Sequence, residues 1–395
     1  MQISLLEQKQ ALISSVDRQA PRLKEIALLI HANPELGFQE KQAADWIIEY
    51  LQSNVFNVER NIAGLKTAFR ATYGSGKPVV AFLGEYDALP DVGHACGHNL
   101  IATAGAGAAV AAKQLADTCD GQIQFIGTPA EELFGGKIIM AQQGVFDNID
   151  AALMVHPESG PNVATARALA CVTLYVEYFG KEAHAAAEPA EGINALDAMT
   201  IAYSAVSALR QHIRPTARVH GIITDGGHAA NVVPGYTAGS FLVRAGDMEY
   251  LDSLKVRVLD CFRAGSLATG AELKYRWDPL AYEPLLNNPT LAGLFTANVE
   301  TLGREIMLED SNQSFGSTDM GNVSRVVPGL HGFISIAPTG VIGHTREFAA
   351  AAASPEGLSG MLDAAKALAM TTADLFVNPD TLKRVKEDFM MGINS

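Results

Sequence analysis

The stretch GEYDALPDVGHACGHN, residues 84–99, concentrates side chains that could do chemistry. It follows an apolar run that predicts a strand and precedes an Ala- and Gly-rich run that predicts a helix. Cys96 and His98 lie two residues apart, so a thiolate and an imidazole could both face one metal ion. The same pattern is also compatible with a buried cysteine beside histidines whose hydrogen bonds are satisfied by the protein.

A pair of glutamates, Glu131 and Glu132, comes shortly after the apolar run Ile123–Ile126. Adjacent carboxylates repel each other unless they share a cation. One of them could bind a metal ion while its neighbour accepts a proton from an activated water. The alternative is an exposed acidic helix start, which the helix dipole favours.

Two further histidines follow the same arrangement, although a single histidine in such a position is more often structural. His156 directly follows the apolar run Ala151–Val155, and His344 lies in a loop before another Ala-rich run. Because the carboxyl ends of parallel strands meet at one edge of a sheet, these groups could converge there. The candidate ligands supply nitrogen, sulfur and oxygen atoms suited to zinc or similar first-row metals: Cys96, His98, Glu132, His156 and His344. Five ligands and a bridging water indicate two ions.

The elements that must position these residues alternate between strand and helix. Residues 8–51 predict two helices with a break at Asn33-Pro34, and strands are expected at residues 66–71, 79–83, 123–126 and 151–155. This alternation predicts an α/β fold with a mostly parallel sheet flanked by helices. Residues 172–277 predict a β-α-β-β-α-β unit of the ferredoxin-like kind. We therefore expect a discontinuous catalytic domain at 1–169 and 284–395, with an inserted domain at 170–283.

Composition excludes several classes of function. The 395 residues carry 29 Lys and Arg against 43 Asp and Glu, a formal net charge of -14, so nucleic acid and anionic membranes are poor partners. The start MQISLLEQKQ lacks a basic segment leading into an apolar core, so no signal peptide is expected. Four widely spaced cysteines favour reduced thiols, and hence the cytoplasm.

Six short motifs occur in an order that resembles one known family. They are EYDALPDVGHACGHN, PAEE, VHP, GKEAHAA, NVVPGY and GHTREF, and they span nearly the whole chain. The chain resembles the aminoacylase and carboxypeptidase G family of dinuclear metallopeptidases, in its amidohydrolase branch with a Cys-Gly-His motif. That branch includes aminobenzoyl-glutamate hydrolases, hippurate and auxin-conjugate hydrolases, and a β-alanyl-lysine dipeptidase type.

The resemblance implies a role for each candidate residue. It makes metal ligands of Cys96, His98, Glu132, His156 and His344, with two divalent ions per subunit, zinc or manganese. It makes Glu131 the general base and Asp87 a carboxylate that orients a ligand. In the inserted domain, which would act as a lid and a dimerisation surface, His184 would stabilise the oxyanion. Asn231 and Arg244 would hold the backbone and carboxylate of the substrate.

The implied protein is a homodimeric, metal-dependent amidohydrolase of small N-acyl amino acids or dipeptide-like substrates. Whether His184 would act within its own chain or across the dimer stays open. Two positions depart from the pattern: Glu85 stands where the wider family has a histidine ligand, and Asp91 stands where related chains often have glycine.

Two other functions are compatible with part of this pattern. Cys96 could be the nucleophile of an amidase, with His98 or His94 as its base, but the paired glutamates and His344 would then have no role. A non-catalytic binding protein on the same fold would have no need of Glu131 as a base.

Overall fold

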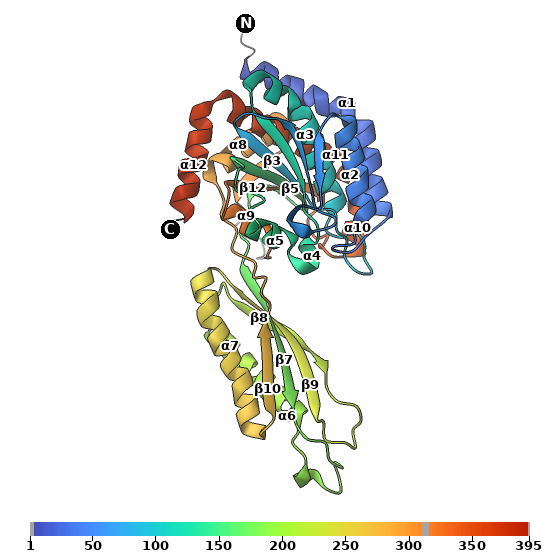
Figure 1. Cartoon of the computed structure of the whole chain (residues 1–395), viewed down its shortest axis with the longest axis vertical. Helices are drawn as coiled ribbons and strands as arrows, with labels where there is room; N and C mark the ends of the chain where they lie inside the picture. The colour runs from blue at the N-terminus through green and yellow to red at the C-terminus, as the bar shows by residue number, and fades with distance from the viewer. Residues whose placement is uncertain (1–3, 310–315, 394–395) are drawn as a thin grey trace. The chain divides into compact units, whose positions relative to one another are not determined.

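The computed structural model describes residues 4–309 and 316–393, which form two compact units (Figure 1). The first unit takes in the described residues of Met1–Arg167, Leu285–Ser314 and Asp319–Ser395. The second takes in those of Ala168–Pro284 and Phe315–Thr318. Each unit has its own apolar core.

An eight-stranded sheet forms the centre of the first unit, in the order β1-β2-β4-β3-β5-β12-β6-β11. Its strands are β1 (Asn57–Arg60), β2 (Phe69–Gly74), β3 (Val79–Gly84), β4 (Gln122–Gly127), β5 (Ala151–Ser159), β6 (Asn162–Thr165), β11 (Ile306–Glu309) and β12 (Gly329–Ala337). The pairs β3–β4, β3–β5, β5–β12 and β6–β11 are parallel, while β1–β2, β2–β4 and β6–β12 are antiparallel. The predicted α/β class with a mostly parallel sheet is confirmed.

Helices cover both faces of this sheet. They are α1 (Leu5–Ala32), α2 (Lys41–Ser53), α3 (His98–Cys119), α4 (Glu131–Phe134), α5 (Gly136–Gln142), α8 (Pro289–Thr301), α9 (Met320–Ser324), α10 (Arg346–Ala351), α11 (Pro355–Val377) and α12 (Pro379–Ile393). In β3, Val80 and Phe82 join the core under α1, α3 and α11, whereas Val79, Ala81 and Leu83 join the core with α5 and α9. A strand buried on both faces has no polar side to expose, which explains its continuous apolar sequence.

Some elements differ from the sequence-based expectation. The strand expected at residues 66–71 is shifted to Phe69–Gly74, and three short strands, β1, β6 and β11, were not expected. Each of these three strands is only four residues long, and β1 is mostly exposed, so they lack the alternating apolar pattern that identifies a strand. The helix break at Asn33-Pro34 is confirmed, because α1 ends at Ala32.

The second unit is an antiparallel sheet packed on two helices. Its elements are β7 (Ala170–Phe179), α6 (Ala195–Leu209), β8 (Arg218–Asp225), β9 (Tyr236–Ala245), α7 (Met248–Thr269) and β10 (Glu272–Trp277). The sheet order is β10-β7-β9-β8, so the expected β-α-β-β-α-β unit is confirmed. Alternate residues of β9 are buried, including Phe241 and Val243, as expected for a sheet with one covered face.

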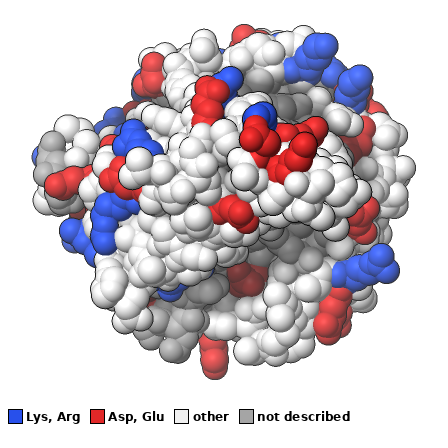
Figure 2. All heavy atoms as spheres, turned by 90° about the horizontal axis from the view of Figure 1, so that it is seen from below, with Lys and Arg blue, Asp and Glu red and all other residues white. Residues whose placement is uncertain are grey.

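Two surface properties bear on partners. On the face shown in Figure 2, Lys and Arg side chains are scattered among Asp and Glu side chains. No helix among the described residues is long and apolar enough to cross a membrane.

Candidate metal centre

The predicted ligands of the first unit meet at the carboxyl ends of neighbouring strands. Their ligand atoms form three overlapping groups, within each of which all atoms lie less than 4.8 Å apart. The groups are Cys96–His98–His156, Cys96–Glu132–His344 and His98–Glu131–Glu132. All five predicted ligands and Glu131 are therefore in one place, although they come from loops and strand ends far apart in the sequence.

The separations within these groups leave room for cations. Sγ of Cys96 lies 3.4 Å from Nε2 of His156. The two carboxylate oxygens of Glu132 lie 3.7 Å from Nε2 of His98 and 3.6 Å from Nε2 of His344. Cys96 belongs to two of the groups, so its sulfur could serve as a ligand in either of them.

The residues present fit divalent metal ions. Nε2 of His98 and Oε1 of Glu132 are buried and have no hydrogen-bond partner. A buried polar atom without a partner costs about 1–3 kcal/mol. A cation between these two atoms would satisfy both of them, and the combination of imidazole, thiolate and carboxylate suits zinc and related ions.

Backbone conformations that ordinary residues avoid place the ligands. Gly97, between Cys96 and His98, has φ 74°, and a Cβ there would lie 2.4 Å from Cγ of Pro157. His344 also has a positive φ, 63°, and its N–H donates to the carbonyl oxygen of Ala95 at 2.9 Å. The glycine thus lets the Cys96–His98 turn pack directly against the residue that follows His156.

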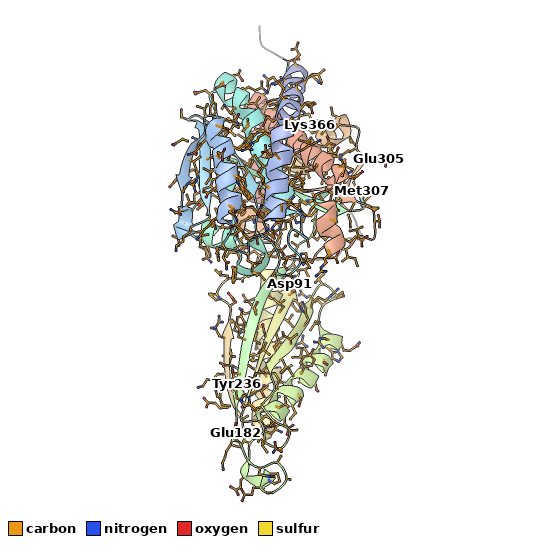
Figure 3. All side chains as sticks on the ribbon, turned by 90° about the vertical axis from the view of Figure 1, so that its right-hand side faces the viewer. Asp91, Glu182, Tyr236, Glu305, Met307 and Lys366 are labelled. Atoms are coloured by element: carbon orange, nitrogen blue, oxygen red, sulfur yellow. The ribbon has the colours of Figure 1, made fainter. Side chains whose placement is uncertain are left out.

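Asp91, in the loop before Cys96, has a positive φ. Asp91 is exposed and has φ 64°, in the left-handed region that glycine favours and that aspartate tolerates better than most residues (Figure 3). Aspartate is therefore compatible with the backbone of this loop.

Two carboxylates hold the ligands in place. Oδ1 of Asp87 lies 3.0 Å from Nδ1 of His98, and Oδ2 accepts the N–H of Glu132 at 3.0 Å. Glu40 accepts the N–H of Ala130 at 2.8 Å and the hydroxyl of Thr67 at 2.9 Å. Ala130 has φ 61° and begins the turn into α4, which carries both glutamates. Sequence reasoning missed Glu40, because it lies 90 residues from its partner in the chain.

Electrostatics disfavour Cys96 as a nucleophile. Burial raises the pKa of its thiol well above the ordinary value, and the carboxylate of Glu132 raises it further. A nucleophilic cysteine needs the opposite shift, toward thiolate near neutral pH. A bound dication would favour the thiolate as a ligand, since metal binding displaces the thiol proton.

Burial and neighbouring charges also shift the pKa values of His156, His98 and Glu131. Burial lowers the pKa of His156, which keeps its imidazole neutral, the form that binds metals. Burial tends to lower the pKa of His98, but the carboxylate of Asp87 and the neighbouring sulfur of Cys96 together raise it well above its ordinary value. Burial, with the carboxylates of Glu85 and Asp319, raises the pKa of Glu131 well above its ordinary value. The site therefore has a strong preference for added positive charge.

Three residues near the centre were missed by sequence reasoning. Nζ of Lys137 donates to Oε1 of Glu85 and, at 2.7 Å, to Oδ1 of Asp319. His331, on β12, has its ring centroid 5.9 Å from that of His156. A lone Lys or Asp gives no sign of its partner in the sequence, because Lys137 and Asp319 are separated by 182 positions.

The three predicted residues of the second unit are His184, Asn231 and Arg244. The first two lie side by side, and Arg244 lies elsewhere in the unit. Nδ1 of His184 accepts the N–H groups of Ala186 and Ala187 at 3.2 and 3.1 Å, so in neutral histidine Nε2 carries the proton and is a donor. The N–H of Ala185 donates to the carbonyl oxygen of Asn231 at 3.0 Å, which places Asn231 beside His184.

Arg244 lies toward the other end of the same sheet. Its Nη1 donates to Oγ of Ser317 at 2.8 Å. His184 lies beyond Tyr236, the first residue of β9. Figure 3 labels Tyr236 and Glu182 at this end of the sheet. Tyr236 and Arg244 are eight residues apart on one strand, a distance of about 26 Å at roughly 3.3 Å per residue. One copy of this unit therefore cannot present His184 and Arg244 to the same small molecule.

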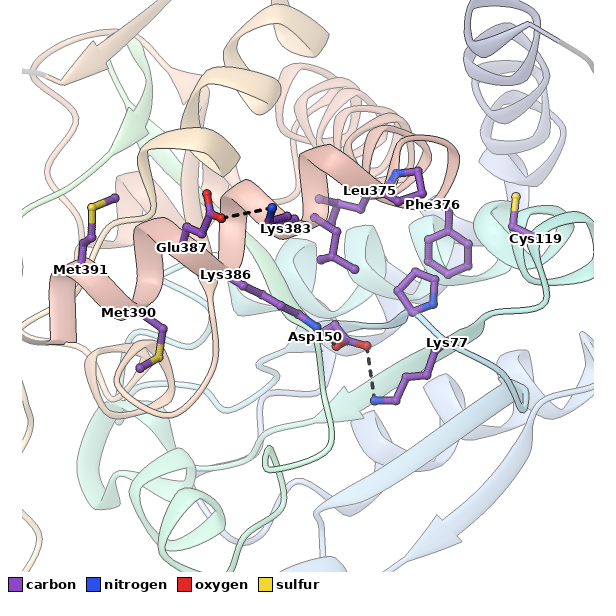
Figure 4. Close-up of a pocket in the computed structure, with 13 residues that line it drawn as sticks. Lys77, Cys119, Asp150, Leu375, Phe376, Lys383, Lys386, Glu387, Met390 and Met391 are labelled. Carbon is purple, nitrogen blue, oxygen red and sulfur yellow. Dashed lines mark hydrogen bonds and ion pairs between the residues drawn. The ribbon is translucent and has the colours of Figure 1, made fainter.

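A large pocket elsewhere in the first unit contains none of the predicted site residues. It has a volume of about 1150 Å³ and lies between α12, the end of α11 and the segments that lead into β3 and β5 (Figure 4). Asp150 binds Lys386 at 2.6 Å and Lys77 at 3.4 Å at its rim. The pocket adjoins the amino ends of β3 and β5, whereas the predicted metal ligands lie at the carboxyl ends of the strands.

Comparison with known proteins decides the family. The sequence model of peptidase family M20/M25/M40 matches residues 81–367. The chain belongs to this family. It is 40% identical to the Xaa-Arg dipeptidase of Mus musculus over 98% of this chain and 93% of the relative. It is 31% identical to a p-aminobenzoyl-glutamate hydrolase polypeptide of Escherichia coli, over 94% of this chain and 92% of the relative.

The fold of the M20/M25/M40 family is shared as well. A dinuclear metal-binding peptidase of family M20 from Bacillus subtilis superposes with a TM-score of 0.67 at 21% identity, over 91% of this chain and 99% of that one. The resemblance read from the sequence motifs is confirmed. As a member of this family, the chain is a metal-dependent hydrolase of amide or peptide bonds, and neither the cysteine-nucleophile amidase nor the non-catalytic binding protein is favoured.

Proposed function

We propose that this chain is a dinuclear dipeptidase that cleaves small dipeptides with a basic C-terminal residue. Its two divalent ions, zinc or manganese, are held by Cys96, His98, Glu132, His156 and His344. The observation that carries the proposal is the pair of ligand groups that share Cys96, one with His98 and His156 and the other with Glu132 and His344. Ions held by these residues would polarise the substrate carbonyl and lower the pKa of a bound water toward neutrality.

Glu131 is the residue that moves protons. It lies next to Glu132 in α4, and its carboxylate is part of the group with His98 and Glu132. It accepts the proton of the attacking water and later delivers a proton to the leaving amine. Asp87 does not touch the reacting atoms but fixes the ring of His98 and the backbone of Glu132.

Substrate recognition falls to the second unit. Arg244 carries a planar guanidinium that can bind a carboxylate through two parallel hydrogen bonds, which suits the free C-terminus of a dipeptide. His184 offers an Nε2–H donor for the oxyanion, and Asn231 beside it offers an amide for the substrate backbone.

A homodimer accounts for the separation of these residues. Because His184 and Arg244 lie at different ends of one sheet, we assign them to different active sites, with His184 and Asn231 contributed by a partner chain. Strand β8 is an edge of its sheet, and its Ile222 and Ile223 side chains are 65% and 38% exposed. An unpaired edge with exposed apolar side chains is suited to pairing with the same edge of a second copy.

The substrate class rests on two observations. The relative with 40% identity is an Xaa-Arg dipeptidase, and the family member from Escherichia coli acts on p-aminobenzoyl-glutamate. The formal net charge of -14 favours approach of a cationic substrate over an anionic one. We place the enzyme in the cytoplasm, where its four cysteines remain reduced thiols.

A matched substrate panel tests this choice. The reconstituted enzyme is assayed on dipeptides that share one N-terminal residue and end in Arg, Lys, Ala or Glu, with β-alanyl-lysine, an N-acyl amino acid and p-aminobenzoyl-glutamate beside them. The Arg and Lys dipeptides should have the highest kcat/KM. A preference for the Glu dipeptide and p-aminobenzoyl-glutamate would contradict the proposed specificity.

A further inference from the structure

Lys137, in α5, is a fully buried lysine close to Glu131. Its ammonium binds Glu85 and Asp319, and its own backbone N–H donates to the second carboxylate oxygen of Asp319 at 2.9 Å. A buried ammonium is tolerated because these bonds replace its contacts with water. Gly136, directly before it, has no room for a side chain, since a Cβ would lie 1.9 Å from the carbonyl oxygen of Pro129. The backbone that carries Lys137 is therefore closely packed against the segment leading to Glu131.

The carboxylates around this ammonium could bind a metal ion by themselves. One oxygen each of Glu85, Glu131 and Asp319 lie within 4.8 Å of one another. Oε2 of Glu85 is buried without a hydrogen-bond partner and lies 3.5 Å from Nε2 of His98. Three carboxylates form a ligand set that suits manganese and similar ions. This acidic cluster borders the metal centre through His98 and shares Glu131 with it.

An ion bound at the acidic cluster would be harmful to catalysis. A carboxylate that ligates a dication has its charged form stabilised and is a poorer base. It is also held away from the position at which it would accept a proton. The ammonium of Lys137 supplies positive charge to the same carboxylates but brings no open coordination position.

We propose that Lys137 is a fixed internal cation that keeps a third divalent ion out of the cluster of Glu85, Glu131 and Asp319. It thereby keeps the carboxylate of Glu131 from becoming a ligand of that ion and preserves the role proposed for it. The second half of this inference rests on the proposed role of Glu131, whereas the exclusion of an ion does not. Lys137 is a positioning residue, because it acts through the carboxylates and not on the substrate.

Metal counting tests the exclusion. Lys137→Met removes the ammonium and keeps a side chain of similar length. Wild type and variant are loaded with Mn²⁺, freed of excess metal by gel filtration, and analysed by inductively coupled plasma mass spectrometry. The variant should hold about one more manganese per chain than wild type. The double variant K137M/D319N should return to the wild-type number, because only two of the three carboxylates remain.

Lys386→Met is the matched control. Lys386 is also an ion-paired lysine, 2.6 Å from Asp150, but it lies outside the acidic cluster. Its loss should leave the manganese count unchanged. In activity titrations, the Lys137→Met variant should pass through a maximum and then lose at least tenfold in kcat with excess Mn²⁺, while KM stays within twofold. Wild type should show no such decline.

Equal manganese counts in folded wild type and Lys137→Met would overturn the proposal. If the variant is unfolded without metal, Mn²⁺ should raise its Tm more than that of wild type, because the ion replaces the lost ammonium. Unfolding that Mn²⁺ does not relieve counts against the proposal. A failure of the proposed function would be seen in wild type itself, as turnover that survives metal removal, so the two failures are distinguishable.

Discussion

Oδ1 of Asp87 lies 3.0 Å from Nδ1 of His98 at the buried floor of the metal centre. This contact leaves Nε2 of His98 free to face a cation, since a histidine with a carboxylate on one nitrogen presents the other as a ligand. The bond between these two residues therefore sets both the orientation and the tautomer of a proposed metal ligand.

Asp87→Asn should weaken metal binding while the fold is retained. The amide can still reach His98, but it lacks the negative charge that makes the imidazole a better ligand. We expect a loss of roughly 10- to 100-fold in metal affinity, as found for comparable supporting residues. Competition with a chromophoric chelator measures this affinity. An unchanged dissociation constant would show that Asp87 does not support the ligand.

The adjacent glutamates should fail differently. Glu131→Gln should keep its metal ions and lose roughly 10²-fold or more in kcat, because it removes the base. Glu132→Gln should lose metal as well as activity, because each of its oxygens lies near a different histidine. Metal analysis of the two purified variants separates the roles, and the reverse pattern would require that they be exchanged.

Gly97→Ala tests whether the Cys96–His98 turn depends on close packing. The variant adds both backbone strain at φ 74° and an overlap with Pro157. Gly303→Ala is the control, since Gly303 has φ 79° in the same unit but nothing within 4 Å of the added Cβ. The control should cost about 1 kcal/mol in the free energy of unfolding, and Gly97→Ala about 3 kcal/mol or more. Urea denaturation compares them, and equal losses would mean that the overlap is relieved at no cost.

The sequence predicted those site residues whose position is indicated by the strands and helices next to them in the chain. Cys96, His98 and the glutamates follow strongly apolar strands, so their position at the sheet edge could be inferred from the pattern of elements. Glu40 and Asp319 lie far along the chain from Ala130 and Lys137, the residues they bind. Only the fold brings such pairs together, and no periodic pattern in the sequence indicates that the two residues are in contact.

The separation of His184 from Arg244 predicts cross-complementation between inactive chains. His184→Ala and Glu131→Gln should each be nearly inactive alone. When they are mixed, unfolded and refolded together, a heterodimer contains one site with both wild-type groups. Turnover should therefore reappear, up to about one quarter of the wild-type value per chain for random pairing. If heterodimers are shown by native mass spectrometry and no activity returns, His184 does not act across the interface.

Metal titration of the metal-free enzyme tests whether turnover needs two metal ions per chain. Protein dialysed against a chelator is titrated with Zn²⁺ or Mn²⁺ while bound metal and hydrolysis of an Xaa-Arg dipeptide are followed together. We expect no turnover without metal and full turnover at two ions per chain. Turnover that persists in metal-free protein, or that is complete at one ion per chain, would contradict a dinuclear centre formed by Cys96, His98, Glu132, His156 and His344.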